Sequence, residues 1–324
     1  LIETLTLSDF FQFFSYKTIF LAIFVALLST KLLAVSRDVL ERVNNKLEKY
    51  VPKKVMQSFT QFLPFMFVLM LFLLLKAILA QTPYYYAHVL IDRVVQKPLL
   101  FVGRTIFFPV VYQLFSSLLW FFGINGPSIT NTIYSPITTV LSHENIHLFN
   151  QGLPVKNIQS WAFSDFLSNY GGGGSTLSLV LVMLLFSKSK KMKKLGKVSL
   201  LPGFFGINEM IIFGFPIVFN FTMMIPFILV PFVNVTLAYM VTRMGFIPKM
   251  FGLYIPWATP IFLSGWLLTG SIKTILFQLI QLIIGCVIYY PFFKKEDLKQ
   301  LKREKEKTMN RDNLDEVDLS TIKL

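Results

Sequence analysis

The sequence has few of the residues that build disulfide-stabilised, metal-binding or water-soluble domains. Of its 324 residues, one is cysteine, three are histidine and 15% are charged. The single Cys286 excludes an internal disulfide framework and a cysteine-based metal site. Its place in an apolar segment indicates a small buried thiol. The chain starts at Leu1 without the charged region and cleavage site of a signal peptide, and we expect its natural start to be missing.

Apolar side chains are what the sequence has in abundance. Hydrophobic residues make up 54% of the chain, 35 residues are phenylalanine, and the mean hydropathy is +0.61. A helix crosses a hydrocarbon layer about 30 Å thick with roughly 20 mainly apolar residues. The composition therefore predicts an all-α, polytopic membrane protein with re-entrant or broken helices. The expected spans are residues 18–35, 59–80, 104–123, 176–187 extended back into the preceding glycines, 211–241 and 274–293.

The net charge of +14 lies in short loops. The tail from Lys294 holds nine basic and eight acidic residues, so the excess comes mainly from residues 37–54 and 188–197. Short basic loops stay on the cytoplasmic side of a membrane, which favours a lipid bilayer over nucleic acid as the partner. Two cytoplasmic loops need an even number of crossings between them, but only three strong segments lie there. A re-entrant or weakly hydrophobic segment at 128–149 is expected to supply the fourth.

Composition divides the chain into three parts. Residues 1–103 are expected to hold N-terminal membrane helices and amphipathic linkers, the latter at 36–55 and 84–102. Residues 104–293 are expected to form the substrate-binding transport region. Residues 294–324 form a charged cytoplasmic tail, which we expect to be solvated and poorly ordered. Within 211–241, Pro216, Pro226 and Pro231 leave open whether there is one span or two.

His143, Glu144 and His147 have the H-E-x-x-H spacing. On a helix this pattern places both imidazoles on one face to bind zinc, with the glutamate as base. The flanking sequence indicates no strong helix and no third ligand, so a coincidental match in a loop is the favoured interpretation. A membrane metalloprotease is the minor alternative.

Four consecutive glycines, residues 171–174, precede Ser175 and an apolar run. Glycine lets backbone groups approach a ligand closely, and it also lets helices pack closely. We favour a lining role for Gly172, Gly173 and Ser175 over simple helix packing. A nucleotide-binding loop is not indicated, because no strand precedes the glycines and no G-K-[ST] follows them.

Asn208 and Glu209 stand inside an otherwise apolar stretch. An ionisable group within a membrane is unfavourable and marks a transport path more often than a structural anchor. Aromatic rings fit the apolar faces of sugars, and amides and carboxylates bind sugar hydroxyls. Trp120 with Asn125, and Trp257, are therefore candidates for a sugar cleft, although each tryptophan alone is more typical of an interfacial anchor.

Several motifs together resemble one transporter family. WFFGINGPSI, LLPGFFGINEMIIFGFPIVFN, IPWATPIFLSGWLLTG and VIYYPFFK occur in an order and spacing similar to the EIIC membrane subunit of the bacterial phosphotransferase system, lactose/cellobiose/diacetylchitobiose branch. The likeness runs from about residue 35 to residue 293. It implies a dimeric helical transporter in the bacterial cytoplasmic membrane that binds a β-linked disaccharide. Such a protein presents the 6-hydroxyl of the sugar to a phosphocysteine on a separate cytoplasmic EIIB, which EIIA and HPr supply.

The resemblance also implies roles for residues. Glu209 would act on the hydroxyl with Asn208 beside it, and Trp120 and Trp257 would lie against the sugar. No cofactor is implied, and the chain would hold only the membrane part of a sugar phosphotransferase. The family usually has histidine where this chain has Asn125, which can hydrogen-bond but not act as an acid or base. A sugar-binding or regulatory paralogue with impaired transport therefore remains an alternative.

Overall fold

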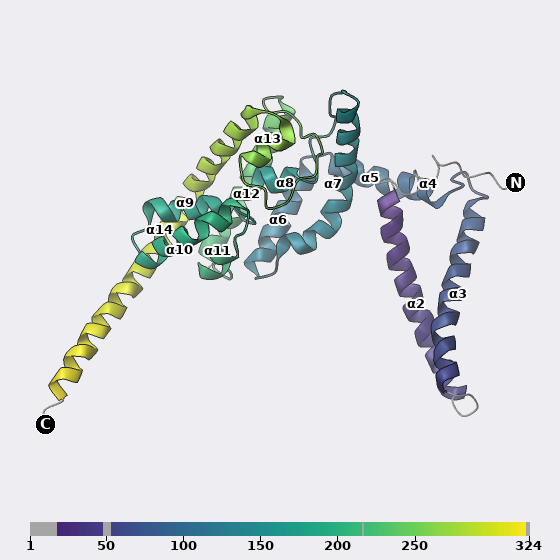
Figure 1. Cartoon of the computed structure of the whole chain (residues 1–324), viewed down its shortest axis with the longest axis horizontal. Helices are drawn as coiled ribbons and strands as arrows, with labels where there is room; N and C mark the ends of the chain where they lie inside the picture. The colour runs from purple at the N-terminus through teal and green to yellow at the C-terminus, as the bar shows by residue number, and fades with distance from the viewer. Residues whose placement is uncertain (1–17, 48–52, 216, 322–324) are drawn as a thin grey trace. The chain divides into compact units, whose positions relative to one another are not determined.

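The computed structural model describes residues 18–47, 53–215 and 217–321 (Figure 1). Within these ranges every regular element is helical and no strand occurs, which confirms the predicted all-α class. Contacts divide the chain into two compact units, Leu1–Phe101 and Val102–Leu324. The expected missing start, which concerns residues before and around Leu1, lies outside the described residues.

In the first unit, α2 (Ile19–Leu47) packs against α3 (Lys53–Leu79), and α4 (Ala87–Ile91) contacts α2. A π-helical turn (Asp92–Gln96) follows α4 and leads into α5 (Lys97–Gly103). The predicted spans at 18–35 and 59–80 are helical. The predicted separate surface helix over 36–55 is wrong in its first part, because residues 36–47 continue α2 without a break. Residues 48–52 lie outside the described part of the chain.

The second unit is built around two long helices that pack against each other, α12 (Phe221–Arg243) and α14 (Ile272–Thr321) (Figure 1). One group of helices contacts α12, and another contacts α14. The elements of this unit are, in addition, α6 (Phe107–Phe121), α7 (Gly126–Asn150), α8 (Phe163–Ser168), α9 (Thr176–Phe186), α10 (Lys190–Phe204), α11 (Glu209–Gly214) and α13 (Leu263–Thr269). Helices α6 and α8 lie on α12, whereas α9, α10 and α13 lie on α14.

Four helices in the described ranges are long and apolar enough to cross a membrane, and a fifth is reached if Ala87–Gly103 and Phe107–Phe121 count as one bent span. The four are Ile19–Arg42, Phe62–Leu79, Phe221–Arg243 and Ile272–Met309. The predicted span at 176–187 is wrong. With 11 residues, α9 is only about 16 Å long, roughly half the hydrocarbon thickness. The glycines before it form a turn and do not lengthen the helix.

The predicted span at 211–241 is divided. The six-residue α11 ends at Gly214, and α12 begins at Phe221 after Asn220, whose side chain accepts hydrogen bonds from two backbone N–H groups of the first turn. Pro226 and Pro231 lie inside α12 and do not break it, and Pro216 lies outside the described residues. At 128–149 the structure has the continuous helix α7 of 25 residues, which favours a weakly hydrophobic helix over a re-entrant segment.

The C-terminal tail is helical, so the expectation of a poorly ordered tail is wrong as far as Thr321. Helix α14, which is 50 residues long in all, continues through the tail. Asp297 on α14 is 2% exposed and accepts hydrogen bonds from Ser187 Oγ (2.9 Å), Lys188 N (2.8 Å) and Ser189 N (3.1 Å). These bonds attach the tail to the turn between α9 and α10.

Candidate functional site

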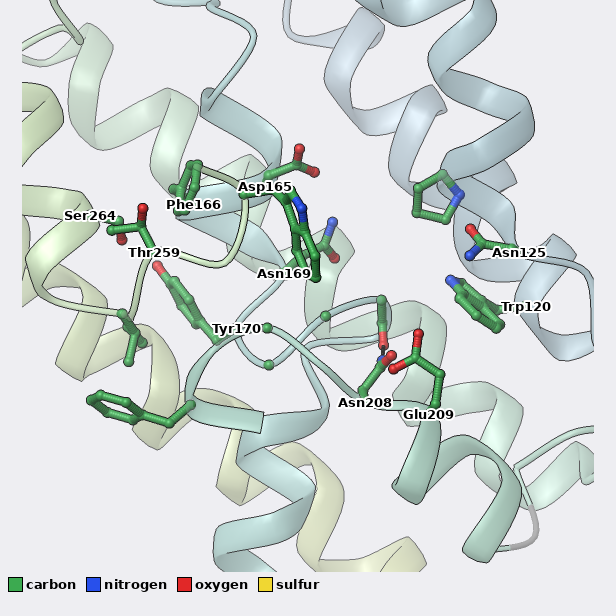
Figure 2. Close-up of a pocket in the computed structure, with 18 of the residues that line it drawn as sticks. Trp120, Asn125, Asp165, Phe166, Asn169, Tyr170, Asn208, Glu209, Thr259 and Ser264 are labelled. Carbon is green, nitrogen blue, oxygen red and sulfur yellow. Dashed lines mark hydrogen bonds between the residues drawn. The ribbon is translucent and has the colours of Figure 1, made fainter. Parts of the chain in front are cut away.

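A cavity of about 470 Å³ lies between α6, α7, α8, the glycine turn, the start of α11 and the segment before α13 (Figure 2). Seven of the eight predicted site residues line it. They are Trp120, Asn125, Gly172, Gly173, Asn208, Glu209 and Trp257. The eighth, Ser175, is buried beside the cavity, where its Oγ accepts a hydrogen bond from Nδ2 of Asn234 (3.3 Å).

The glycine turn touches its neighbours so closely that side chains are excluded. A Cβ at Gly172, where φ is +90°, would lie 2.7 Å from Cγ of Asn208. A Cβ at Gly173 would lie 2.6 Å from Nε1 of Trp120. Nδ2 of Asn208 donates to the carbonyl oxygen of Gly173 (2.8 Å). The glycines therefore hold Asn208 and Trp120 against the backbone of the turn while lining the cavity.

Polar side chains of the spanning helices hold this irregular backbone in place. The hydroxyl of Tyr289 donates to the carbonyl of Gly174 (2.6 Å). Nε2 of Gln281 donates to the carbonyls of Leu167 (3.1 Å) and Asn234 (2.7 Å). In a membrane, backbone groups outside a regular helix must find partners inside the protein. Helix α14 thus supplies hydrogen bonds that the short elements around the cavity lack, and Nδ2 of Asn234 on α12 adds one to the carbonyl of Ser168 (3.3 Å).

Asn208 and Glu209 stand at the start of α11 and reach into the cavity (Figure 2). The same view shows Trp120 and Asn125 on one side and Asp165 and Asn169 on another. Asn125 is the N-cap residue of α7, and its Oδ1 accepts a hydrogen bond from Ser128 N (3.2 Å). The side-chain oxygen of Asn125 therefore caps the helix, and its amide N–H groups remain to donate hydrogen bonds to a ligand.

Two polar residues that line the cavity were not predicted from the sequence. They are Asp165 in α8 and Asn169, which directly follows α8. Burial raises the pKa of the Asp165 carboxyl to about 6, and a hydrogen bond with the Asn169 side chain opposes this rise. The sequence does mark Asp165 as a candidate, because it is an ionisable residue among the aromatic and small residues of WAFSDF. The rule that selected Glu209 selects Asp165 as well.

Three buried polar atoms of the cavity lining have no hydrogen-bond partner in the described part of the chain. They are Nε1 of Trp120, Oδ1 of Asn169 and Oγ of Ser264. Buried polar atoms are nearly always hydrogen-bonded, so each calls for a partner. The set comprises a donor, an acceptor and a hydroxyl that can be either. All three belong to residues of the lining, where a ligand with several hydroxyl groups would bring both donors and acceptors.

The H-E-x-x-H residues lie on helix α7, so the interpretation of this match as a loop is wrong. Their carboxylate is nevertheless engaged elsewhere. Both oxygens of Glu144 accept from Nη2 of Arg104 (3.0 and 2.8 Å), and one accepts from Nδ2 of Asn157 (2.8 Å). Among the described residues, no three His, Cys, Asp or Glu side chains are grouped so that they could hold a metal ion. Glu144 on α7 thus binds Arg104 in the turn that precedes α6.

Helices long and apolar enough to cross a membrane, packed around a polar cavity, define the chain as a membrane-integral protein. Residues 7–231 match the model of the phosphotransferase system EIIC family, and the chain belongs to this family. The oligo-beta-mannoside-specific EIIC component of Bacillus subtilis (strain 168) is 35% identical over 294 residues, which cover 90% of this chain and 66% of the relative. The cellobiose-specific EIIC component of Geobacillus stearothermophilus is 35% identical over 297 residues, covering 90% and 65%.

A solved structure is also similar. The transporter ChbC, the IIC component from the N,N'-diacetylchitobiose-specific phosphotransferase system, aligns with a TM-score of 0.82 at 33% identity. The alignment covers 90% of this chain and 68% of ChbC. The family resemblance drawn from the motifs is therefore confirmed. The chain spans about two thirds of the length of the curated relatives it matches.

Proposed function

We propose that the chain is a sugar permease that carries a β-linked disaccharide across the bacterial cytoplasmic membrane and presents it for phosphorylation by EIIB. The observation that supports this most directly is the lining of one cavity. It combines two carboxyl groups, two tryptophans and four asparagines. The relatives are named as specific for oligo-beta-mannosides, cellobiose and diacetylchitobiose, which supports a sugar of this type as the substrate.

Glu209 is the proposed catalytic residue. Its carboxylate accepts the proton of the sugar 6-hydroxyl as the hydroxyl oxygen attacks the phosphorus of phosphocysteine on EIIB. The new O–P bond forms, the S–P bond breaks, and the cysteine of EIIB leaves as a thiolate. Nδ2 of Asn208 is bound to Gly173, so its Oδ1 is left to accept a sugar hydroxyl. The faces of Trp120 and Trp257 pack against the sugar rings.

The remaining proposed contacts position the sugar. Asn125 donates from its amide, Asp165 accepts from hydroxyls with Asn169 beside it, and the backbone of Gly172 and Gly173 lies along the cavity wall. Ser175 acts indirectly by fixing the end of the turn. EIIA and HPr recharge EIIB, and the permease works as a homodimer in this scheme.

The second candidate function is a sugar-binding or regulatory paralogue with impaired phosphorylation, and Asn125 favours it. The side-chain oxygen of Asn125 is used by the helix cap, and its amide does not titrate. Such a paralogue binds sugar but does not support phosphoryl transfer. The replacement Asn125→His restores a titratable group, and it removes an asparagine cap worth about 1 kcal/mol of stability.

The test is sugar phosphorylation in vesicles that contain the chain and are supplied with EIIB, EIIA, HPr and a phosphoryl donor. Labelled cellobiose, lactose and diacetylchitobiose are compared. We expect sugar phosphate inside vesicles for at least one of them. The replacement Glu209→Gln should retain sugar binding and lose phosphorylation, whereas Glu306→Gln, the same change on the exposed tail, should be neutral.

Failure of all three sugars to bind or to be phosphorylated by folded protein would contradict the permease assignment. Sugar binding without phosphorylation, with activity gained in Asn125→His, would instead establish the paralogue. A thermal unfolding curve for each variant separates loss of function from loss of the fold.

A further inference from the structure

A second cavity, of about 540 Å³, shares Phe204 and Ile261 with the first and is almost entirely apolar. Leucines of α9, α10 and α14 form most of its wall, among them Leu181, Leu200 and Leu279. Lys197 is the charged residue in this lining. The volume is that of a pocket for a sizeable ligand. Such a ligand would be apolar where it meets the leucines and anionic at the end that meets the lysine.

The face of helix α10 that reaches this cavity is basic near the start of the helix and apolar further along. Lys193, Lys194 and Lys197 are exposed, and the first two precede Lys197 by four and three residues, which places them beside it on the helix surface. The same face continues through Leu200 and Leu201 to Phe204, about 10 Å further along the axis. In the described part of the chain none of the three lysines has an acidic partner.

The opposite face of α10 is occupied by the protein itself. Met192, Gly196, Ser199 and Gly203 are buried, and Gly196 packs against Met183 of α9. The face with the lysines and leucines is therefore the one left for a partner outside the chain. A partner that matches it has a negative charge next to a hydrocarbon chain.

We propose that this site binds an anionic phospholipid of the cytoplasmic leaflet. The phosphate lies on Lys197 with Lys193 and Lys194 nearby, and one acyl chain enters the apolar cavity. The basic segment 188–197 is expected on the cytoplasmic side, where anionic lipid attracts juxtamembrane lysines. A soluble anion makes no use of the apolar wall, and a zwitterionic lipid carries no net charge for the lysines.

The site has a second consequence, which rests on the proposed sugar function. Phe204 and Ile261 line both cavities, so they form part of the wall between lipid and sugar. An acyl chain that fills the apolar cavity supports this wall from behind. Bound anionic lipid is therefore expected to raise the affinity for disaccharide.

The test is lipid binding to the purified full chain in a neutral detergent, measured by native mass spectrometry. Short-chain phosphatidylglycerol is titrated against phosphatidylcholine of the same chain length, and against inorganic phosphate alone. We expect saturable binding of phosphatidylglycerol only. The replacement Lys197→Ala should weaken it about fivefold, since one lysine near an anionic surface contributes on that scale.

Two further variants make the test specific. Lys302→Ala removes another exposed lysine, in the tail, and should leave lipid binding unchanged. Leu200→Trp places a large ring in the apolar cavity and should weaken binding with all three lysines intact. Thermal unfolding of each variant confirms the fold, and this readout does not depend on sugar transport.

Three results would overturn the proposal. Inorganic phosphate binding as tightly as phosphatidylglycerol would show an anion site without a lipid. Equal losses in Lys197→Ala and Lys302→Ala would show general attraction to charge. Unchanged lipid binding in Lys197→Ala, together with weaker binding of phosphorylated EIIB, would make the basic face a protein-docking surface.

Discussion

Gly174 and Ser175 end the glycine turn with left-handed backbone, at φ of +78° and +54°. Glycine adopts this region without strain, and serine does so less readily. Ser175 is held there by Asn234, whose side chain binds its hydroxyl. At Gly174 a Cβ would overlap the ring of Phe227, which is fully buried in α12. The turn thus depends on glycine at this position for two separate reasons.

The replacement Gly174→Ala is expected to lower the free energy of unfolding by about 2–5 kcal/mol, the sum of left-handed strain and overpacking against Phe227. Gly152→Ala is the matched control. Gly152 also has a left-handed φ, +70°, but no atom lies within 4 Å of its Cβ position. Its loss should be limited to about 1–2 kcal/mol of strain. Equal loss in both variants, measured by thermal unfolding in detergent, would show that the contact with Phe227 is unimportant.

The carboxyl group of Asp165 provides a test by pH. Burial raises its pKa to about 6, so lowering the pH from about 7 to about 5 protonates it and removes a charged acceptor of sugar hydroxyls. Disaccharide affinity should fall about tenfold, the scale of one hydrogen bond to a charged group. A raised folded-state pKa means that protonation favours the folded chain, so this loss concerns binding and not unfolding.

Calorimetric titration of sugar at each pH checks this prediction. The replacement Asp165→Asn should bind weakly at about pH 7 and lose most of the pH dependence. Glu209 is the other carboxyl group that lines the cavity. A pH dependence that persists unchanged in Asp165→Asn would assign the titration to a group other than Asp165.

At the scale of elements, the long apolar helices act as a scaffold for short ones. Nε2 of Gln278 donates to the carbonyl of Phe166 (2.9 Å), and its Oε1 accepts from the backbone of Phe262 (3.0 Å). Gln281, one turn further along α14, binds two carbonyls and accepts from the hydroxyl of Tyr170 (2.5 Å). Helix α8 and the glycine turn are thereby fixed to α14.

The replacement Gln281→Leu should lower the free energy of unfolding by about 3 kcal/mol or more, because it leaves two carbonyls and the Tyr170 hydroxyl without this partner. It should also weaken sugar binding, since Tyr170 lines the cavity. Gln300→Leu is the same change further along α14, in the charged tail, and should be nearly neutral. Thermal unfolding and sugar titration of both variants make the comparison. Equal stability of the two would contradict the scaffold role.

Sequence patterns predict some of these elements and not others. Long apolar runs at 18–35 and 274–293 indicate helices reliably, since length and hydrophobicity decide them locally. The run at 176–187 looks like a span, but left-handed glycines stop the helix before Thr176. Seven of the eight predicted site residues line the cavity, because unusual polar and glycine residues in apolar sequence mark a site. The cap formed by Asn125 was not foreseen, because it depends on where α7 begins.

At the scale of the whole molecule, α14 connects two regions of the second unit. Its apolar part carries Tyr289 and Gln281 to the glycine turn, and its charged part carries Asp297 and Glu304 to the turn between α9 and α10. Oε1 of Glu304 accepts from Ser189 Oγ (2.6 Å) and from the backbone of Lys191 (3.0 Å). The acidic residues offset the lysines at the start of α10, where the helix dipole disfavours positive charge.

Truncation tests this connection. A chain that ends after Met309 keeps Asp297 and Glu304, and it should unfold at the same temperature as the full chain. A chain that ends after Lys295 lacks both, so backbone N–H groups of Lys188 and Ser189 lose their carboxylate partner. Because Asp297 is buried and accepts three hydrogen bonds, we expect a loss of about 3 kcal/mol or more. Faster proteolysis at the turn between α9 and α10 should accompany it. If both truncated chains match the full chain in unfolding temperature and proteolysis, the tail does not hold this turn.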